Sequence, residues 1–87
     1  MDERIGQFLN FLAVEKNASN NTIAAYRNDL SQFLTFVESK SPGKTIEAIR
    51  HDLIVSYVEH LRTEAHYKDA TVARKVAAVK SFYGFLS

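Results

Sequence analysis

Hydrophobic residues recur along the chain at spacings of three and four, which is the period of amphipathic helices. A first helix is predicted over residues 3–16 and a second over 20–39, with Ser19 as the N-cap of the second. The apolar face of the first helix consists of Ile5, Phe8, Leu9 and Leu12. That of the second consists of Ile23, Tyr26, Leu30, Phe33 and Val37. Pro42 and Gly43 then favour a turn.

The second half of the chain also predicts two helices. Residues 51–64 form the third, whose inward positions are Leu53, Ile54, Tyr57, Val58 and Leu61. The fourth, with Asp69 as its expected N-cap, carries the stripe Val72, Val76, Val79, Tyr83 and Leu86. Ile46 and Ile49, in the connection before the third helix, are expected to pack under the core. No strand pattern competes, so the predicted fold class is all-α with four helices.

Aromatic residues divide between these apolar faces and other positions. Tyr26, Tyr57 and Tyr83 lie within the faces and are expected to be core tyrosines. Four phenylalanines lie off the main stripes: Phe11, Phe36, Phe82 and Phe85. Some are expected to pack between helices, and any that is exposed would indicate a neighbouring surface.

Composition limits the classes of protein to which the chain can belong. Its 87 residues suit one small domain, and the absence of cysteine excludes a disulfide framework and a thiolate zinc site. The N-terminal segment carries acids at positions 2 and 3 and resembles neither a signal peptide nor a membrane span, so we expect a cytoplasmic protein without a membrane partner.

Catalytic chemistry is not expected in this chain. The three histidines, His51, His60 and His66, share no metal-ligand spacing, and the glycines are isolated, so there is no phosphate-binding loop. No serine has an organised base beside it. We therefore expect no enzyme activity, no metal, no cofactor and no small-molecule ligand.

Charge is segregated although the net charge is only +1. Residues 66–87 contain four basic side chains against Asp69 alone, whereas residues 45–65 carry an excess of acids. A concentration of positive charge at one end of a domain suits an anionic partner.

Two helices have polar faces that lack acids. Opposite its apolar stripe, the fourth helix carries Thr71, Arg74, Lys75, Ala78 and Ser81, so Arg74 and Lys75 are expected to be exposed. The second helix carries Asn20, Ala24, Arg27, Asn28, Ser31 and Thr35. These side chains contact phosphates and base edges, and helix N-termini favour phosphate. One such face would often be only solvated, but two favour nucleic acid.

Lys80 lies at the margin of the apolar stripe of the fourth helix. It is expected either to reach a phosphate from the side or to pair with a carboxylate such as Asp29.

Two segments carry a resemblance to a known family. "SNNTIAAYRNDLSQFLTFV" resembles the motif that opens the core-binding domain of tyrosine recombinases, the phage integrase family, particularly the Xer type. The matching residues are Ser19, Asn21, Thr22, Tyr26, Asp29, Leu30 and Phe33. "ATVARKVAAVKSFYGFL" is similar to the closing helix of that domain, with Thr71, Arg74, Val76, Ala77, Lys80, Phe82, Tyr83 and Leu86 in register. Lys80 replaces the usual arginine, while Thr71 and Ala77 replace serines.

The resemblance implies a fold and a function for the whole chain. The fold would be a four-helix SAM-like bundle of two helical hairpins, with residues 1–87 forming the core-binding domain. This domain would be one half of a clamp around double-stranded DNA, with its second and fourth helices at the major groove. The catalytic domain would lie outside the chain, and other recombinase protomers would be partners of the full-length protein. The residues expected to contact DNA are Asn20, Asn21, Thr22, Arg27, Asn28, Thr71, Arg74, Lys75 and Lys80.

Two alternatives remain open from the sequence. A helical protein–protein interaction module would bind partners through exposed Phe11 or Phe85 and respond little to salt. A stand-alone helical regulator would have no catalytic partner domain.

Overall fold

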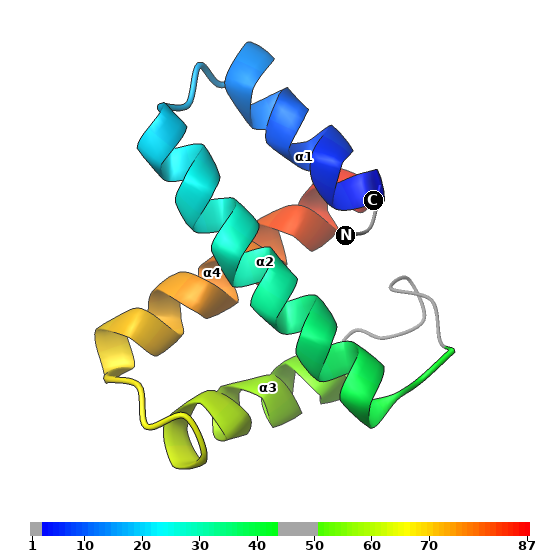
Figure 1. Cartoon of the computed structure of the whole chain (residues 1–87), viewed down its shortest axis with the longest axis vertical. Coiled ribbons are helices and arrows are strands. Elements are labelled where there is room, and N and C mark those ends of the chain that lie inside the picture. The colour runs from blue at the N-terminus through cyan, green and yellow to red at the C-terminus, as the bar shows by residue number, and fades with distance from the viewer. Residues whose placement is uncertain (1–2, 44–50) are drawn as a thin grey trace.

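The computed structural model describes residues 3–43 and 51–87, which contain four helices (Figure 1). These are α1 (Glu3–Val14), α2 (Asn20–Lys40), α3 (His51–Thr63) and α4 (Asp69–Leu86). The prediction of an all-α fold is confirmed. The expected packing of Ile46 and Ile49 lies outside the described residues.

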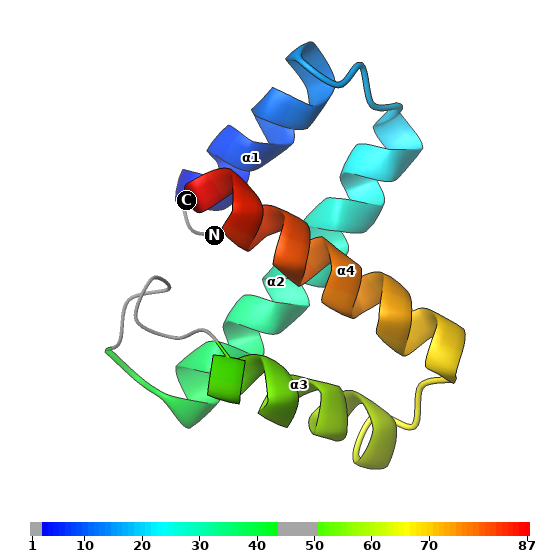
Figure 2. The same cartoon turned by 180° about the vertical axis from the view of Figure 1, so that it is seen from behind.

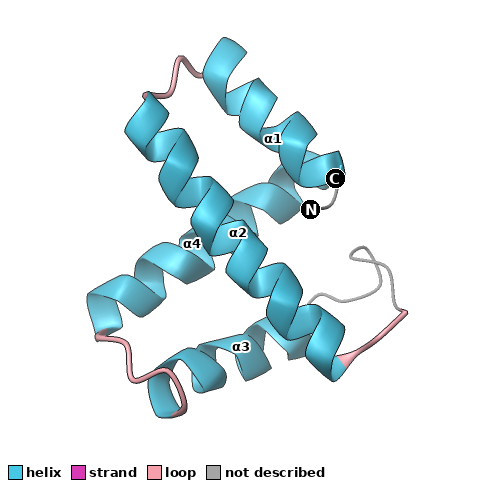
Figure 3. Ribbon diagram, viewed as in Figure 1, coloured by secondary structure: helices cyan, strands magenta, loops and turns pink. Residues whose placement is uncertain are grey.

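The helices form two antiparallel hairpins, α1 with α2 and α3 with α4, and α2 crosses α4 near the middle of both helices (Figures 1 and 2). The N-terminal ends of α2 and α4 lie on the same side of the molecule, on the left in Figure 1 and on the right in Figure 2. Loops join the helices, and no strand occurs in residues 3–43 or 51–87 (Figure 3).

Both hairpin connections contain a residue in the left-handed region. Asn17 has a φ of 52°, and the Ala18 amide donates to the Leu12 carbonyl at 3.0 Å. His66 has a φ of 58°, and the Tyr67 amide donates to the Leu61 carbonyl at 3.0 Å. In each case the amide donates to the carbonyl six residues earlier, which satisfies a carbonyl left free at the C-terminus of the helix. In the first case the helix, α1, ends at Val14, two residues before the predicted end.

The core is apolar and largely aromatic. Its buried hydrophobic residues are Ile5, Phe8, Leu9, Leu12, Leu30, Phe33, Phe36, Val37, Tyr57, Leu61, Val72, Ala78, Val79 and Phe82. The ring of Phe8 lies 5.7 Å from those of Tyr26 and Phe82, which joins α1 to α2 and α4. The ring of Tyr57 lies 5.1 Å from those of Phe33 and Phe36, which joins α3 to α2.

The first three helices bury the faces that their patterns predict. All four predicted positions of α1 are buried, and on α3 Tyr57 and Leu61 are buried while Leu53, Ile54 and Val58 pack partly buried against the core. On α2 the predicted N-cap is confirmed, because the Thr22 amide donates to Ser19 Oγ at 3.1 Å. The buried face of α2 is wider than predicted, since it also includes Asp29 and Phe36.

The predicted orientation of α4 is partly wrong. Its buried residues are Val72, Lys75, Ala78, Val79 and Phe82, whereas Val76, Tyr83 and Leu86 are half-buried. Its N-cap is Lys68, and Asp69 is instead the first helical residue. The helix is rotated because the ammonium of Lys75 has an ion-pair partner inside the domain, so its aliphatic stem can be buried.

Phe11 and Phe85, the expected anchors of an interaction module, are both half-buried. Their rings lie 5.2 Å apart and pack against the core. They therefore stabilise the contact between α1 and α4 and offer no isolated exposed ring.

Candidate nucleic-acid interface

A buried carboxylate lies where α2 crosses α4. Asp29 of α2 is only 2% exposed. Its Oδ1 accepts hydrogen bonds from Lys75 Nζ at 2.9 Å and from Arg74 Nη2 at 3.1 Å. Two adjacent residues of α4 therefore bind one oxygen of α2, and we call these three side chains the Asp29 cluster.

The two cations of the Asp29 cluster differ in their contact with solvent. The side chain of Lys75 is 4% exposed, whereas that of Arg74 is 57% exposed. Burying a charge is costly unless it is paired, and the ion pair between Asp29 and Lys75 meets that requirement inside the domain. Arg74 instead extends from the buried carboxylate into solvent, so it brings a positive charge to the surface at the crossing point.

Lys75 also contacts Tyr67, which is hydrogen-bonded to α2. Its Nζ lies 5.0 Å from the ring centre of Tyr67, within the range of a cation–π interaction. Gln32 Nε2 of α2 donates to Tyr67 Oη at 3.3 Å. Tyr67 precedes α4, so these contacts attach the connection between α3 and α4 to α2.

Tyr57 lies beneath this cluster with its side chain fully buried. Its hydroxyl has no hydrogen-bond partner among the residues that the structure describes. Burial raises the pKa of this phenol above its ordinary value, and the negative charge of Asp29 raises it further. Tyr57 thus remains neutral at physiological pH and contributes to packing.

The predicted contact residues of α2 are all exposed: Asn20, Asn21, Thr22, Arg27 and Asn28. Thr22 also takes part in the N-cap, because its Oγ1 accepts from Ser19 Oγ at 3.0 Å. Asn28 lies four residues before Gln32 and so shares the flank of α2 that faces Tyr67. Arg27 lies two residues before Asp29 and projects about 200° around the helix from it. The side chain of Arg27 therefore leaves α2 on the flank away from α4.

The predicted contact residues of α4 are separated by the structure. Arg74 is exposed and Thr71 is half-buried on the same flank, three residues apart. The expectation that Lys75 is exposed is wrong, since it is only 3% exposed. Lys80 is exposed, but it lies six residues after Arg74 and projects about 240° further around the helix. Lys75, and not Lys80, is the lysine that pairs with Asp29.

Sequence reasoning offered Asp29 as a possible partner of Lys80, but it missed the pair between Asp29 and Lys75 and the contacts of Gln32 and Tyr67. One signal was available, because Val72, Lys75, Val79 and Phe82 follow one another at spacings of three, four and three. A lysine whose ammonium is buried in an apolar stripe needs a charged or polar partner, and Asp29 occupies the margin of the apolar face of α2.

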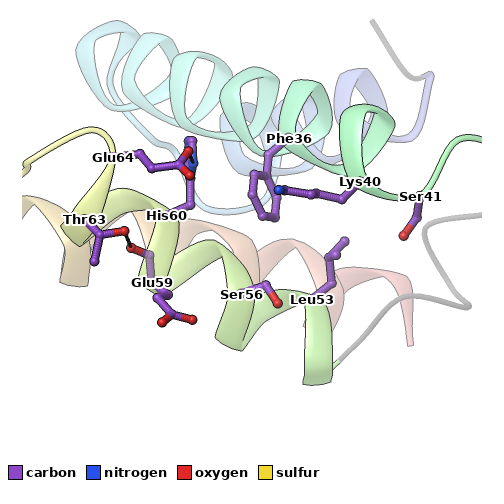
Figure 4. Close-up of a pocket in the computed structure, with 9 residues that line it drawn as sticks. All are labelled: Phe36, Lys40, Ser41, Leu53, Ser56, Glu59, His60, Thr63 and Glu64. Carbon is purple, nitrogen blue, oxygen red and sulfur yellow. Dashed lines mark hydrogen bonds and ion pairs between the residues drawn. The ribbon is translucent and has the colours of Figure 1, made fainter.

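A separate pocket of about 490 Å³ lies between the C-terminal part of α2 and α3 (Figure 4). Within it, His60 Nδ1 lies 2.8 Å from Glu64 Oε2 and Phe36 forms part of the wall. Glu59 and Glu64 make the α3 side acidic, which does not suit an anionic ligand. Among the residues that the structure describes, no three potential ligands gather to hold a metal ion.

The described helices also lack the combination of length and apolar character that crossing a membrane requires.

Comparison with known proteins identifies relatives of the chain. It is 47% identical over 87 residues to the tyrosine recombinase XerC of Roseiflexus sp. (strain RS-1) and 37% identical over 86 residues to the tyrosine recombinase XerD of Halalkalibacterium halodurans. These alignments cover 100% and 99% of the chain but 27% and 28% of the relatives, so the chain spans about a quarter of their length. No solved structure matches the chain.

The family comparison covers nearly the whole chain. Residues 5–87 match the family described as phage integrase, N-terminal SAM-like domain. The four helices, paired in two hairpins, are consistent with that description. The chain therefore belongs to the phage integrase N-terminal SAM-like domain family.

Proposed function

We propose that this domain binds duplex DNA through the exposed surface of α2 and α4, as one half of the clamp of a tyrosine recombinase. The proposal rests mainly on Arg74, whose side chain is exposed where these helices cross and lies beside the polar flank of α2. The relatives named as tyrosine recombinases give independent support.

The proposed contact residues are Asn20, Asn21, Thr22, Arg27 and Asn28 on α2 and Thr71, Arg74 and Lys80 on α4. Lys75 is not proposed as a DNA contact, because its side chain is buried and its ammonium is paired with Asp29. We propose Asn28 and Arg74 as the central contacts, and Arg27 and Lys80, which project to other sides of their helices, as peripheral ones. Arginine and asparagine contact both phosphates and base edges, so this arrangement suits a groove and its adjacent backbone.

The complete protein would break and rejoin DNA strands as its relatives' names indicate, together with further protomers and in the cytoplasm. Residues 1–87 would then form its core-binding domain, and the catalytic groups would belong to another part of that protein. An isolated half-clamp lacks the avidity of the second half, so we expect a Kd near ~10⁻⁴–10⁻⁶ M.

A pair of charge reversals tests the proposal. Arg74→Glu should weaken binding to a short duplex by at least about tenfold, while Lys40→Glu at the C-terminal end of α2 changes the net charge equally and should have much less effect. Fluorescence anisotropy over a range of salt concentrations measures both. Loss of one phosphate contact should lower the slope of log K against log[salt] by about 0.9. Equal losses in the two variants would contradict a specific role of α4.

A further inference from the structure

We propose that Asp29 is a positioning residue that orients Arg74 for DNA, and that buried Lys75 cancels the charge of Asp29 so that Arg74 acts at the surface with its full positive charge. This inference rests on the proposed function and assigns separate roles to three residues that α2 and α4 bring together at their crossing.

The first step is the geometry of the arginine. Arg74 holds the buried Oδ1 of Asp29 through Nη2 at 3.1 Å, although 57% of its side chain is exposed. A guanidinium carries five N–H donors in a rigid plane, so one bond to Asp29 fixes the plane while other donors remain directed to solvent. The carboxylate is itself fixed, because it is only 3% exposed and lies between two packed helices.

The second step concerns charge. If Asp29 were paired with Arg74 alone, its negative charge would offset the positive charge of Arg74. The attraction of Arg74 for a phosphate would then be weaker. Lys75 donates to the same oxygen at 2.9 Å and is buried, so Asp29 and Lys75 together are neutral. The cluster as a whole therefore carries one positive charge, and that charge lies on its exposed member.

The third step concerns the cost of binding. A long exposed side chain loses rotamer freedom when a partner immobilises it, which reduces affinity. Asp29 restricts Arg74 before DNA arrives, so less freedom is lost on binding. Arg27 provides the comparison within the same protein, because it is exposed and forms no ion pair with any residue in the described part of the chain.

The decisive variant is the double substitution Asp29→Asn and Lys75→Met. It preserves the net charge of the protein and leaves no unpaired charge in the core, so the variant should fold. It removes the charged anchor of Arg74. We expect duplex affinity to fall about 3- to 10-fold, as releasing one ordered side chain predicts. Arg74→Ala should then cost less affinity in this background than in the wild-type domain, because Arg74 is no longer pre-oriented.

Two controls separate positioning from bulk charge. Asp29→Asn alone and Glu59→Gln, at an exposed position of α3, each raise the net charge by one. Because Asp29→Asn leaves the buried ammonium of Lys75 without its carboxylate partner, its affinity is measured only under conditions where NMR spectra show the variant to be folded. Bulk electrostatics predicts that both variants tighten DNA binding, whereas positioning predicts that only Glu59→Gln does so and that folded Asp29→Asn binds more weakly.

NMR relaxation of the arginine Nε–Hε groups gives a readout without DNA. In the wild-type domain Arg74 should be ordered and Arg27 mobile, and in the double variant both should be mobile. An Arg74 group that is as mobile as Arg27 in the wild-type domain would overturn the positioning role even if no variant folds. Wild-type affinity in the double variant would overturn it as well. A wild-type domain that shows ordered Arg74 but no binding to duplex would instead overturn the proposed function.

Discussion

Asp29 is the residue on which the polar contacts between α2 and α4 converge. Its Oδ1 accepts hydrogen bonds from one buried and one exposed cation, and Lys75 also contacts the ring of Tyr67. An exposed ion pair contributes little to stability, whereas removing one partner of a buried pair leaves an uncompensated charge in the core. Lys75 and Arg74 should therefore respond differently to substitution, although they are neighbours in the sequence.

Lys75→Met should lower the free energy of unfolding by about 3–5 kcal/mol, because it leaves Asp29 with only its exposed partner. Urea denaturation measures this change. Arg74→Met serves as the matched control and should cost no more than about 1 kcal/mol, since its side chain is 57% exposed. Equal costs for the two variants would contradict the division of roles within the cluster.

Tyr57→Phe should leave stability at neutral pH unchanged or raise it by about 1 kcal/mol, since it removes a buried hydroxyl without a partner. The pKa of this phenol is raised in the folded domain. As the pH rises through about 10, the unfolded chain therefore loses the Tyr57 proton first, and the free energy of unfolding falls. The variant should lack this part of the alkaline loss. Denaturation at pH 7 and pH 11 tests both statements, and a destabilisation above about 2 kcal/mol at pH 7 would contradict the first.

At the scale of elements, periodicity predicted the inward faces of α1 and α3 because every residue on those stripes is apolar. On α4 it correctly predicts the burial of Val72 and Val79, but it places Lys75 in solvent and leaves Phe82 off the apolar stripe, although both are buried. The true stripe could not be selected from α4 alone, because it depends on an acid 46 residues earlier that reaches Lys75 across the helix crossing. Arg74 is exposed, as the sequence predicts, but its bond to Asp29 could not be predicted because it depends on the relative placement of two helices.

The orientation of α4 makes a prediction for its two adjacent aromatic residues. Phe82→Ala should destabilise the domain by about 3–5 kcal/mol, because its ring is fully buried against Phe8. Tyr83→Ala should cost clearly less, since Tyr83 is half-buried. Thermal or urea unfolding of both variants provides the check. The reverse order would support the orientation that periodicity alone predicts.

At the scale of the whole molecule, two hairpins cross so that the N-terminal ends of α2 and α4 lie on one side (Figure 1). The aromatic contacts of Phe8 and Tyr57 hold α1 and α3 against this crossing, and the pocket between α2 and α3, which Glu59 and Glu64 help to line, does not include Arg74. The domain thus separates a surface suited to an anion from one that is not. We propose α2 and α4 as the surface for DNA, and membership of the phage integrase N-terminal SAM-like domain family supports a role in DNA binding.

Amide chemical-shift mapping with a short duplex at low salt tests this central claim most directly. The account predicts that the largest changes fall on the exposed parts of α2 and α4 around Asn28 and Arg74, and that they diminish steeply as salt is added. Changes confined to α1 and α3, or no changes at low salt, would contradict it.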